Sequence, residues 1–591
     1  MQTVTQKIGT EYTDWVMKDD DRRGASWIFI SAPTGSGKTY FIFETLLKYL
    51  VSESKSMLYL VNRSILKKQL KDKVKDMSPE ISNHIHIKLY QEIEKEIKLN
   101  EYNAGKSNDC TYDNMKQYMK YDCVVCDECH YFLSDSNYNT DTALSFRWIY
   151  DYFSKKIKIF MSATIDDIKL YIKAYDIIRA KKQEQYKYNY IGFDILNKIV
   201  EDANSFKELY RGMIFDKHNY VEYDIERNYD YLNITIINKE NIVDCISNSA
   251  KTEKWLIFVD NIKFGNHLKK KFKDNAVAFL TSENKNDEEE LKVVHDMATK
   301  EKTNKRIVIA TSVIDNGINI KDIELRNVVI MADTEMEFIQ MLGRKRKDGS
   351  TLKLYICKYD KQHFERRLRN TKEKINIANE YISYIIEKKD NYEYAYNENM
   401  AIEHLHIKYM RELAENTTKL NYARSIFNVY GGVLYLNLLA YNNLRRLREY
   451  YEYVIEQFDT NGESAYVKIQ LAWLGMEGKA EDIINNSNVS IEERSLKKVA
   501  DAFESKLGQA MSSDEWKGFS YSLRDDLRRL LDSLEIDEEL KKVYNAVGKS
   551  DRGISNKSMK YLSEHFDLPY RLKAKDGMYT IERIMEDKSI K

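Results

Sequence analysis

The stretch that decides the fold is Trp27-Ile28-Phe29-Ile30-Ser31-Ala32-Pro33-Thr34-Gly35-Ser36-Gly37-Lys38-Thr39. Its first four residues are a continuous apolar run, the pattern of a strand buried on both faces of a parallel sheet. A glycine-rich turn follows, and residues 43–50 then repeat their apolar side chains at helical spacing. Strand, turn and helix in this order predict a phosphate-binding loop at the edge of an α/β sheet.

The loop has the residue types that phosphate binding requires. Backbone N–H groups of such a loop point at the phosphates, and the helix N-terminus adds positive potential. Lys38 is expected to contact the β- and γ-phosphates, as an otherwise solvated loop residue, and the Thr39 hydroxyl to bind Mg²⁺. Ala32 stands where glycine is common, a variant that a turn-shaping position tolerates. The predicted nucleotide-binding residues here are Pro33, Thr34, Gly35, Ser36, Gly37, Lys38 and Thr39.

A second motif, Asp127-Glu128-Cys129-His130, directly follows the apolar run 123–126. Open α/β sheets bind ligands at the carboxyl ends of their strands, which is where Asp127 emerges. We expect Asp127 to hold Mg²⁺, through water, and Glu128 to orient and deprotonate the water that attacks the γ-phosphate. Two surface carboxylates after a strand are the alternative.

Strand and helix patterns divide the chain into four parts. Buried-strand candidates alternate with charged helical stretches up to about residue 175, and a second such series begins at residue 220 without a phosphate loop of its own. Strand signals almost vanish after about residue 370. The predicted fold is α/β, with two doubly wound parallel-sheet domains and a mainly helical C-terminal domain. The predicted boundaries are 1–175, a helical connector at 176–219, 220–370 and 371–591.

Composition limits the class of protein but not its partners. A chain of 591 residues is too long for one core. Its 93 basic residues balance its 93 acidic ones, so any nucleic-acid contact must come from a local patch. Six cysteines are too few for a disulfide framework, and no apolar run reaches the roughly 18 residues of a membrane span. We expect a cytoplasmic protein without a membrane partner.

Two more motifs complete a familiar set, Ser162-Ala163-Thr164 and Gln340-Met341-Leu342-Gly343-Arg344-Lys345-Arg346. With the first two, and in this order, they resemble superfamily 2 helicases and translocases of the DExH type over about residues 10–360. The Lys-, Ile-, Asn- and Tyr-rich composition fits a bacterium or its mobile elements. The resemblance implies two RecA-like domains, ATP and Mg²⁺ as cofactors, and nucleic acid as a partner.

The resemblance also implies roles for the newly quoted motifs. Ser162 and Thr164 would couple the nucleotide state to nucleic-acid engagement. Gln340, Arg344 and Arg346 would act in catalysis, with the arginines reaching the γ-phosphate across the cleft between the domains. The common family form has its second arginine at the position of Lys347, whereas Arg346 stands one residue earlier. A basic solvated turn is the alternative for Arg346 and Lys347.

Weaker family matches indicate where a nucleic-acid strand would lie. Arg63, in Leu60-Val61-Asn62-Arg63-Ser64, and Gln91 match strand-contacting motifs; a helix start or a core edge is the alternative. Thr311 opens a segment that resembles the motif bridging ATP and nucleic acid. Gly317 in that segment would let the backbone approach the nucleotide closely.

Three further patterns have structural explanations as well as functional ones. Cys123, Cys126 and Cys129 suggest a metal site, but odd spacing on a strand sends the first two side chains to opposite faces, so a core role is favoured. Tyr12 and Trp15 could stack on adenine, although core packing is favoured. Residues 555–566 and 570–584 predict a helix and a hairpin; winged-helix packing is one reading, and ordinary small-domain packing is favoured.

The favoured function is therefore an ATP-dependent motor that unwinds or remodels nucleic acid, mainly through backbone contacts. One alternative is the motor subunit of a nuclease or anti-phage defence complex, with a protein partner bound through the C-terminal domain. Another is an ATP-gated nucleic-acid-binding switch that does not unwind. The sequence leaves the choice between DNA and RNA open.

Overall fold

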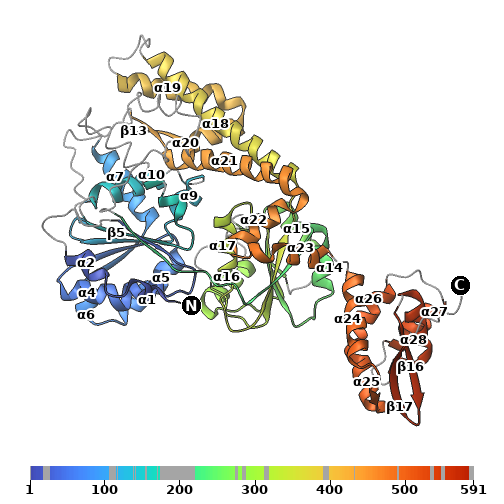
Figure 1. Cartoon of the computed structure of the whole chain (residues 1–591). Coiled ribbons are helices and arrows are strands. Elements are labelled where there is room, and N and C mark those ends of the chain that lie inside the picture. The colour runs from blue at the N-terminus through green and yellow to red at the C-terminus, as the bar shows by residue number, and fades with distance from the viewer. Residues whose placement is uncertain are drawn as a thin grey trace. The chain divides into compact units, whose positions relative to one another are not determined.

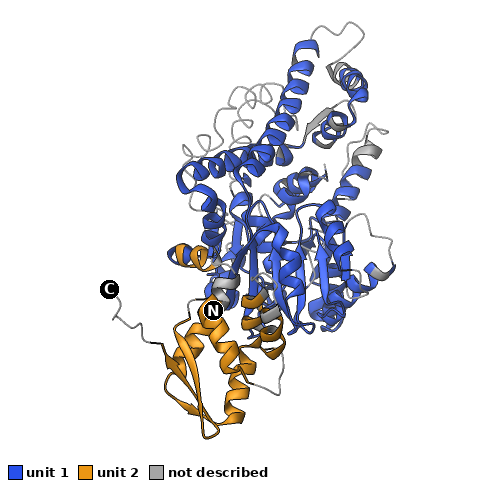
Figure 2. Ribbon diagram, turned by 90° about the vertical axis from the view of Figure 1, so that its right-hand side faces the viewer, with its two compact units in different colours: residues 1–480 blue, residues 481–591 orange. Residues whose placement is uncertain are grey.

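A computed structural model describes residues 2–17, 27–104, 115, 117–137, 139, 141–153, 156–169, 171–172, 220–272, 277–281, 288–311, 319–389, 398–430, 433–488, 491–532, 538–547, 553–566 and 568–584. The connector expected at 176–219 lies outside these residues. The chain divides into two compact units, residues 1–480 and 481–591 (Figure 2).

The first sheet has six parallel strands in the order β3-β2-β4-β5-β1-β6. They are β1 Trp27–Ser31, β2 Met57–Val61, β3 Ile85–Leu89, β4 Cys123–Asp127, β5 Ile157–Ser162 and β6 Tyr220–Asp224. Its helices are α1 Val4–Ile8, α2 Tyr12–Met17, α3 Lys38–Tyr40, α4 Leu47–Ser52, α5 Ser64–Lys75, α6 Pro79–Ser82, α7 Tyr90–Ala104, α9 Tyr131–Ser134 and α10 Thr142–Tyr152. A π-helical segment, η1 Phe41–Leu46, joins α3 to α4.

Alternate residues of β1 enter two different cores. Trp27 and Phe29 lie in the cluster on one face of the sheet, whereas Ile28 and Ile30 lie in the cluster on the other. Burial on both faces explains why this strand is apolar without alternation. The predicted division begins the second domain at residue 220, whereas β6 pairs with β1 and lies in the first sheet. The predicted domain boundaries otherwise stay a prediction.

The second sheet also has six parallel strands, in the order β7-β12-β11-β8-β10-β9. They are β7 Leu232–Ile237, β8 Lys254–Phe258, β9 Val277–Leu280, β10 Ile307–Ala310, β11 Leu325–Ile330 and β12 Leu352–Cys357. Its helices are α14 Ile242–Ser247, α15 Ile262–Lys271, α16 Glu288–Lys300 and α17 Glu335–Leu342. The two sheets with their helices confirm the predicted pair of RecA-like domains.

A helical region follows within the first unit. It contains α18 Lys361–Lys389, α19 Glu398–Glu412, α20 Thr417–Ile426, α21 Leu438–Asn461 and α22 Ala465–Trp473, with the hairpin β13 Phe427–Tyr430 and β14 Val433–Leu436; α23 Ala480–Asn488 follows at the boundary between the units. Figure 1 shows α18 and α21 as long neighbouring helices, with α21 running from α9 to α22. Among the described residues, no helix combines the length and the apolar character that crossing a bilayer demands.

The second unit is a small domain with its own core. Its helices are α24 Ile491–Ser505, α25 Ser513–Ser522, α26 Arg524–Asp532, α27 Glu538–Val547 and α28 Asn556–His565, and its strands β15 Ala510–Met511, β16 Tyr570–Lys575 and β17 Met578–Arg583 form an antiparallel sheet in the order β15-β17-β16. The predicted helix and hairpin are confirmed as α28 and β16-β17. Positive φ angles of 51° at Asp576 and 76° at Gly577 make the tight turn that this pair of residues favours.

Candidate active site

The glycine-rich loop leaves the carboxyl end of β1 and turns sharply into α3. Gly35 and Gly37 have φ angles of 86° and 92°, which side-chain-bearing residues rarely adopt. Gly37 is the N-cap residue of α3, and the Ser36 hydroxyl donates to the Pro33 carbonyl at 2.7 Å. The sequence therefore folds locally as predicted, into a strand, a glycine turn and the start of a helix.

Lys38 lies inside the loop that it follows. Its side chain is 8% exposed, and Nζ donates to the Ala32 carbonyl at 2.7 Å. Burial lowers the pKa of Lys38, while the charges of Glu128 and Asp127 act in the opposite direction. The expectation of a solvated lysine is wrong, because the turn wraps around the side chain and a carbonyl holds its ammonium group.

Asp127 is the last residue of β4 and is also buried. Its Oδ2 accepts from the Tyr59 hydroxyl at 2.8 Å, and its Oδ1 accepts from the backbone N–H of Glu128 at 3.1 Å. Tyr59 also hydrogen-bonds the Thr39 side chain, so the two predicted Mg²⁺ ligands share one neighbour. Burial raises the pKa of Asp127, and the adjacent Glu128 carboxylate raises it further. A hydroxyl and a carboxylate are hard oxygen donors that suit Mg²⁺.

Glu128 has the backbone of a strained position, with φ at 50°. Its Oε2 lies 3.3 Å from Nδ1 of His130. Burial acts to raise the pKa of Glu128, but the hydrogen bond with His130 and the positive charge of Lys38 outweigh it and the pKa is lowered. The lowered pKa favours the carboxylate form of Glu128, which is the form that can accept a proton.

His130, in the second motif, contacts residues of two other motifs. Its Nδ1 lies 3.0 Å from the Ser162 hydroxyl and 3.4 Å from Nε2 of Gln340. Ser162 Oγ in turn accepts from the Thr164 backbone N–H at 3.1 Å. Gln340 comes from α17 in the second domain, so the contact crosses between the domains. The sequence prediction did not assign His130 a role, although it stands in the second motif.

The two arginines of the last motif have different surroundings. Arg344 follows α17 and its side chain turns back onto that helix. Its Nη2 donates to Oε1 of Gln340 at 2.9 Å, and its Nε donates to the backbone carbonyl of Gln340 at 3.1 Å. Arg346 Nη1 is buried, and no hydrogen-bond partner for it occurs among the described residues. Nη1 lies 3.7 Å from the place that a Cβ on Gly35 would occupy. Arg346 thus lies directly against the phosphate loop.

Backbone pairing fixes where both arginines point. The N–H of Ile320 donates to the Arg344 carbonyl, and the N–H of Arg346 donates to the Ile320 carbonyl, each at 2.9 Å. Burial lowers the pKa of Arg346 to about 10, and the nearby charge of Arg344 adds to this effect. Lys347, at the usual position of the family's second arginine, instead lies over the Tyr231 ring at 5.1 Å.

Gly343 brings the last motif into contact with the first. A Cβ placed on Gly343 would lie 2.7 Å from Oγ1 of Thr34 and 3.2 Å from the Ile339 carbonyl. Separations below 3.0 Å are not found for real Cβ atoms, so only glycine fits without movement. The two domains therefore touch beside the phosphate loop.

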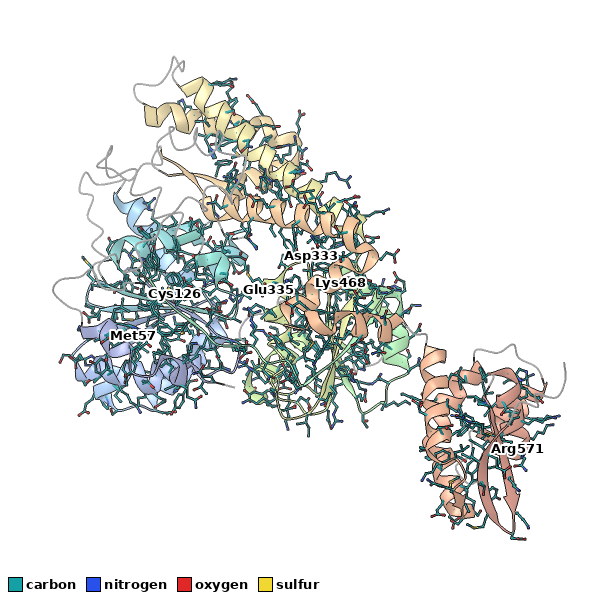
Figure 3. The ribbon with its side chains drawn as sticks, viewed as in Figure 1. Met57, Cys126, Asp333, Glu335, Lys468 and Arg571 are labelled. Atoms are coloured by element: carbon teal, nitrogen blue, oxygen red, sulfur yellow. The ribbon has the colours of Figure 1, made fainter. Side chains whose placement is uncertain are left out.

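Arg227 is a cross-domain residue that the sequence analysis missed. Its Nη2 donates to the Ala163 carbonyl at 2.8 Å, and its Nη1 binds Oε1 of Glu335 at 2.7 Å. Ala163 is the middle residue of the Ser-Ala-Thr motif, and Glu335 opens α17. Figure 3 labels Glu335 on the side of the second domain that faces the first. No motif marks Arg227, because its neighbours come from distant parts of the chain.

The predicted strand-contacting residues of the first domain lie at neighbouring strand ends. Gln91 Nε2 donates to the Asn62 carbonyl at 3.2 Å, and Arg63 is the N-cap residue of α5. Within the described ranges, Arg63 Nε, Gln91 Oε1 and both amide atoms of Asn62 are buried without a hydrogen-bond partner. Buried polar groups normally find one, so this cluster suits a polar ligand. Thr311 follows β10 in the second domain, and Gly317 lies outside the described residues.

The cysteines and the upstream aromatic residues belong to cores. Cys123 lies in the cluster on one face of the first sheet and Cys126 in the cluster on the other, as strand alternation predicts. Burial raises the pKa of both thiols. Trp15 packs edge-on against Phe41, with ring centroids 6.2 Å apart, which confirms the expected core packing.

Comparisons with known proteins agree with this arrangement. Residues 3–167 match the family model of the type III restriction enzyme res subunit, and residues 238–349 match that of the helicase conserved C-terminal domain. Together these matches support helicase superfamily 2. No significant match to a curated protein was found.

Solved structures give low-scoring likenesses. Dbp5 from S. cerevisiae, bound to RNA and ADP BeF3, is 15% identical over 57% of this chain and 80% of its own, with a TM-score of 0.35. The helicase MrfA bound to DNA is 14% identical over 60% and 47%, with a TM-score of 0.37. A putative HsdR subunit fragment from Vibrio vulnificus is 15% identical over 57% and 60%, with a TM-score of 0.34.

Proposed function

We propose that this protein is an ATP-dependent superfamily 2 helicase or translocase of the DExH type, of bacterial or mobile-element origin. The observation that carries the proposal is the approach of the second domain to the phosphate loop. Arg346 lies against Gly35 there, and Gln340 reaches His130. A nucleotide bound in the loop would therefore contact both domains at once.

The chemistry assigned to the first domain is hydrolysis of the γ-phosphate bond. Lys38 and the loop N–H groups would bind the phosphates, and Thr39 and Asp127 would hold Mg²⁺, which neutralises phosphate charge when bound. Glu128, whose pKa is lowered, would accept a proton from the attacking water. His130, whose Nδ1 lies 3.3 Å from Oε2 of Glu128, would fix the direction of that carboxylate.

The chemistry assigned to the second domain is stabilisation of charge on the transferred phosphate. Arg346 has a buried guanidinium nitrogen that pairs with nothing else in the described part of the chain, which suits an anionic ligand. Arg344 would support it, held by Gln340. Gly317, in a family-like segment, would approach the nucleotide from the same domain.

Coupling to nucleic acid would run through the Ser-Ala-Thr motif. Ser162 contacts His130, so a change at the nucleotide can be passed to Thr164 and the residues after it. Arg63, Gln91 and Thr311 would contact the strand, mainly through its backbone. Alternating affinity of the two domains for the strand would then convert hydrolysis into stepping.

The match of residues 3–167 to a restriction-enzyme subunit model favours a second candidate function. In that case the chain is the motor subunit of a nuclease or defence complex and binds its partner chain through the C-terminal region. An ATP-gated binding switch without unwinding is the remaining alternative.

One set of measurements tests the three candidate functions: the helicase, the motor subunit and the ATP-gated switch. Steady-state ATP hydrolysis is measured with no nucleic acid and with matched single- and double-stranded DNA and RNA, followed by a strand-separation assay. Stimulated hydrolysis with separation supports the helicase, and stimulated hydrolysis without separation supports the translocating subunit or the switch. Co-purification of a nuclease chain distinguishes those two. Lys38→Ala is the control for contaminating ATPases, and hydrolysis that survives this substitution in a folded protein contradicts the nucleotide assignment.

A further inference from the structure

Helix α21 belongs to the cores of both α/β domains. Near its start, Leu439 is fully buried in the first domain's cluster. Further along, Tyr451, Val454 and Phe458 are buried in the second domain's cluster. An α-helix rises 1.5 Å per residue, so about 28 Å of continuous helix separate Leu439 from Phe458. Figure 1 shows this helix passing from one domain to the other.

The first end of α21 is fixed beside the second motif. Asn437 is buried, and its Nδ2 donates to the Ser136 carbonyl at 3.3 Å. Its Oδ1 also caps the helix by accepting from the Ala440 N–H at 3.1 Å. Ser136 follows Asp127-Glu128-Cys129-His130 with only the short helix α9 between them. One side chain therefore starts the helix and attaches it to the segment that leaves the catalytic motif.

A second attachment lies beside the Ser-Ala-Thr motif. Arg446 Nη1 forms an ion pair with Oδ2 of Asp167 at 2.8 Å, and Asp167 stands three residues after Thr164. The two side chains are 22% and 32% exposed. Ion pairs at this exposure add little to folding stability, on the order of 0–1 kcal/mol. The pair is better placed to set position than to stabilise the fold.

Aromatic contacts link the far end of α21, through α18 and α22, to the segment before α17, the helix that carries Gln340. Phe458 and Tyr451 pack against Phe364 of α18, with ring centroids 6.0 and 6.2 Å apart. Phe364 packs in turn on Tyr466, with ring centroids 4.5 Å apart, and the Tyr466 hydroxyl donates to the Ala332 carbonyl at 2.6 Å. Ala332 lies three residues before Glu335, the first residue of α17. The first end of α21 thus contacts a segment that follows the second motif, and its far end is connected through Phe364 and Tyr466 to the segment before α17.

We propose that α21 is a strut that holds the two domains at the spacing where Arg346 meets the phosphate loop, and that Arg446 is a positioning residue acting through Asp167. Because the helix is packed into both cores, a wide separation of the domains would require its packing to break at one end. That α21 sets the spacing of the domains is inferred only from its contacts with both of them. Its effect on hydrolysis rests on the proposed function.

The spacing is measured by single-molecule energy transfer on the full chain without nucleotide. Dyes are attached through non-canonical amino acids at Met119 of the first domain and Ile323 of the second, which are 57% and 60% exposed. We expect one narrow distance distribution for the unsubstituted protein. Arg446→Ala and Asp167→Ala should each broaden it toward longer distances, and the exchange Asp167→Arg with Arg446→Asp should narrow it again.

Glu452→Ala is the matched control. Glu452 lies on the same helix and forms an ion pair of the same length, 2.8 Å, with Lys372 of α18 rather than with the first domain. Glu452→Ala should leave the distribution of interdomain distances unchanged. If losing an ion pair acted only by weakening α21, Glu452→Ala would broaden the distance distribution too. If α21 sets the spacing of the domains through Asp167, only the Arg446 and Asp167 substitutions should broaden it.

Hydrolysis gives the second readout. Arg446→Ala should lower kcat by roughly 2- to 30-fold, the range of a coupling residue, and change KM for ATP little. Unchanged distances in Arg446→Ala, Asp167→Ala and Asn437→Ala would overturn the strut. If the unsubstituted protein hydrolyses no ATP but these substitutions still lengthen the distance, the proposed function fails and the strut stands.

Discussion

The side-chain amide of Gln340 lies 3.4 Å from Nδ1 of His130, although the two residues are 210 positions apart. His130 also lies 3.3 Å from the Glu128 carboxylate, and Gln340 accepts from Arg344 at 2.9 Å. The second domain is therefore connected to Glu128, the proposed base in the first domain, by a short chain of side chains. Changes on either side of this chain should affect hydrolysis more than nucleotide binding.

Glu128→Gln should bind ATP normally and hydrolyse it on the order of 10² to 10⁴ times more slowly, the usual loss for a general base. The amide keeps the size of the side chain but cannot accept the proton. Single-turnover hydrolysis and a fluorescent ATP analogue measure the two properties separately. An equal loss of binding would show that Glu128 is structural.

Arg346→Ala should reduce turnover by roughly 10³ or more, as for other arginines that act across a domain interface. Its guanidinium lies against Gly35, whereas that of Arg344 is held by Gln340. Arg344→Ala should reduce turnover similarly only if the Arg344 guanidinium moves to the γ-phosphate when the two domains close on ATP. Lys347→Ala is the control, since this side chain lies over Tyr231. If both arginine variants keep strand-stimulated turnover, the second domain does not complete the site.

Gly343→Ala should separate the domains slightly and slow hydrolysis while leaving the fold intact. The added methyl group would lie 2.7 Å from Thr34 Oγ1. Thr34→Ala in the same chain removes that oxygen and should recover part of the turnover. Gly478→Ala is the control, because a Cβ there meets nothing within 4 Å. Equal kinetics for the Gly343 and Gly478 variants would contradict the close approach.

Arg227→Ala should uncouple hydrolysis from nucleic acid. The guanidinium binds both the Ala163 carbonyl and Glu335. Its loss would leave the Ser-Ala-Thr motif and α17 in place but remove this link between them. We expect strand-stimulated kcat to fall by roughly 2- to 30-fold, with unstimulated hydrolysis less affected. Arg227→Lys keeps the charge, but a lysine ammonium group lacks the planar guanidinium that binds both acceptors. This variant should therefore recover only part of the strand-stimulated kcat. Identical stimulation in the alanine variant would remove Arg227 from the coupling route.

Elemental analysis of the purified protein should find no stoichiometric zinc or iron. Cys123 and Cys126 lie on opposite faces of the first sheet, and burial raises the pKa of both thiols, which disfavours the thiolate that a metal needs. Replacing Cys123, Cys126 and Cys129 with alanine or serine should change no metal content. One equivalent of bound metal lost on replacement would overturn the geometric reasoning.

Short-range patterns in the sequence determined the strands, the phosphate loop and the C-terminal hairpin. Each depends on neighbours only a few residues apart: a strand buried on both faces must be apolar throughout, and a tight turn needs residues that tolerate positive φ, such as Gly37 or Asp576-Gly577. The sequence therefore predicted two parallel sheets and a helical C-terminal region without any long-range information.

Only the tertiary structure decided which side chains meet across the cleft. Lys38 is buried because the folded loop closes around it, and Arg346 rather than Lys347 lies against the loop because Ile320 pairs with the backbone beside it. Arg227 and Arg446 find their partners through β6 and α21, whose places depend on packing between segments far apart in the chain. Packing of this kind is set by the sum of many distant contacts, so no local motif records it.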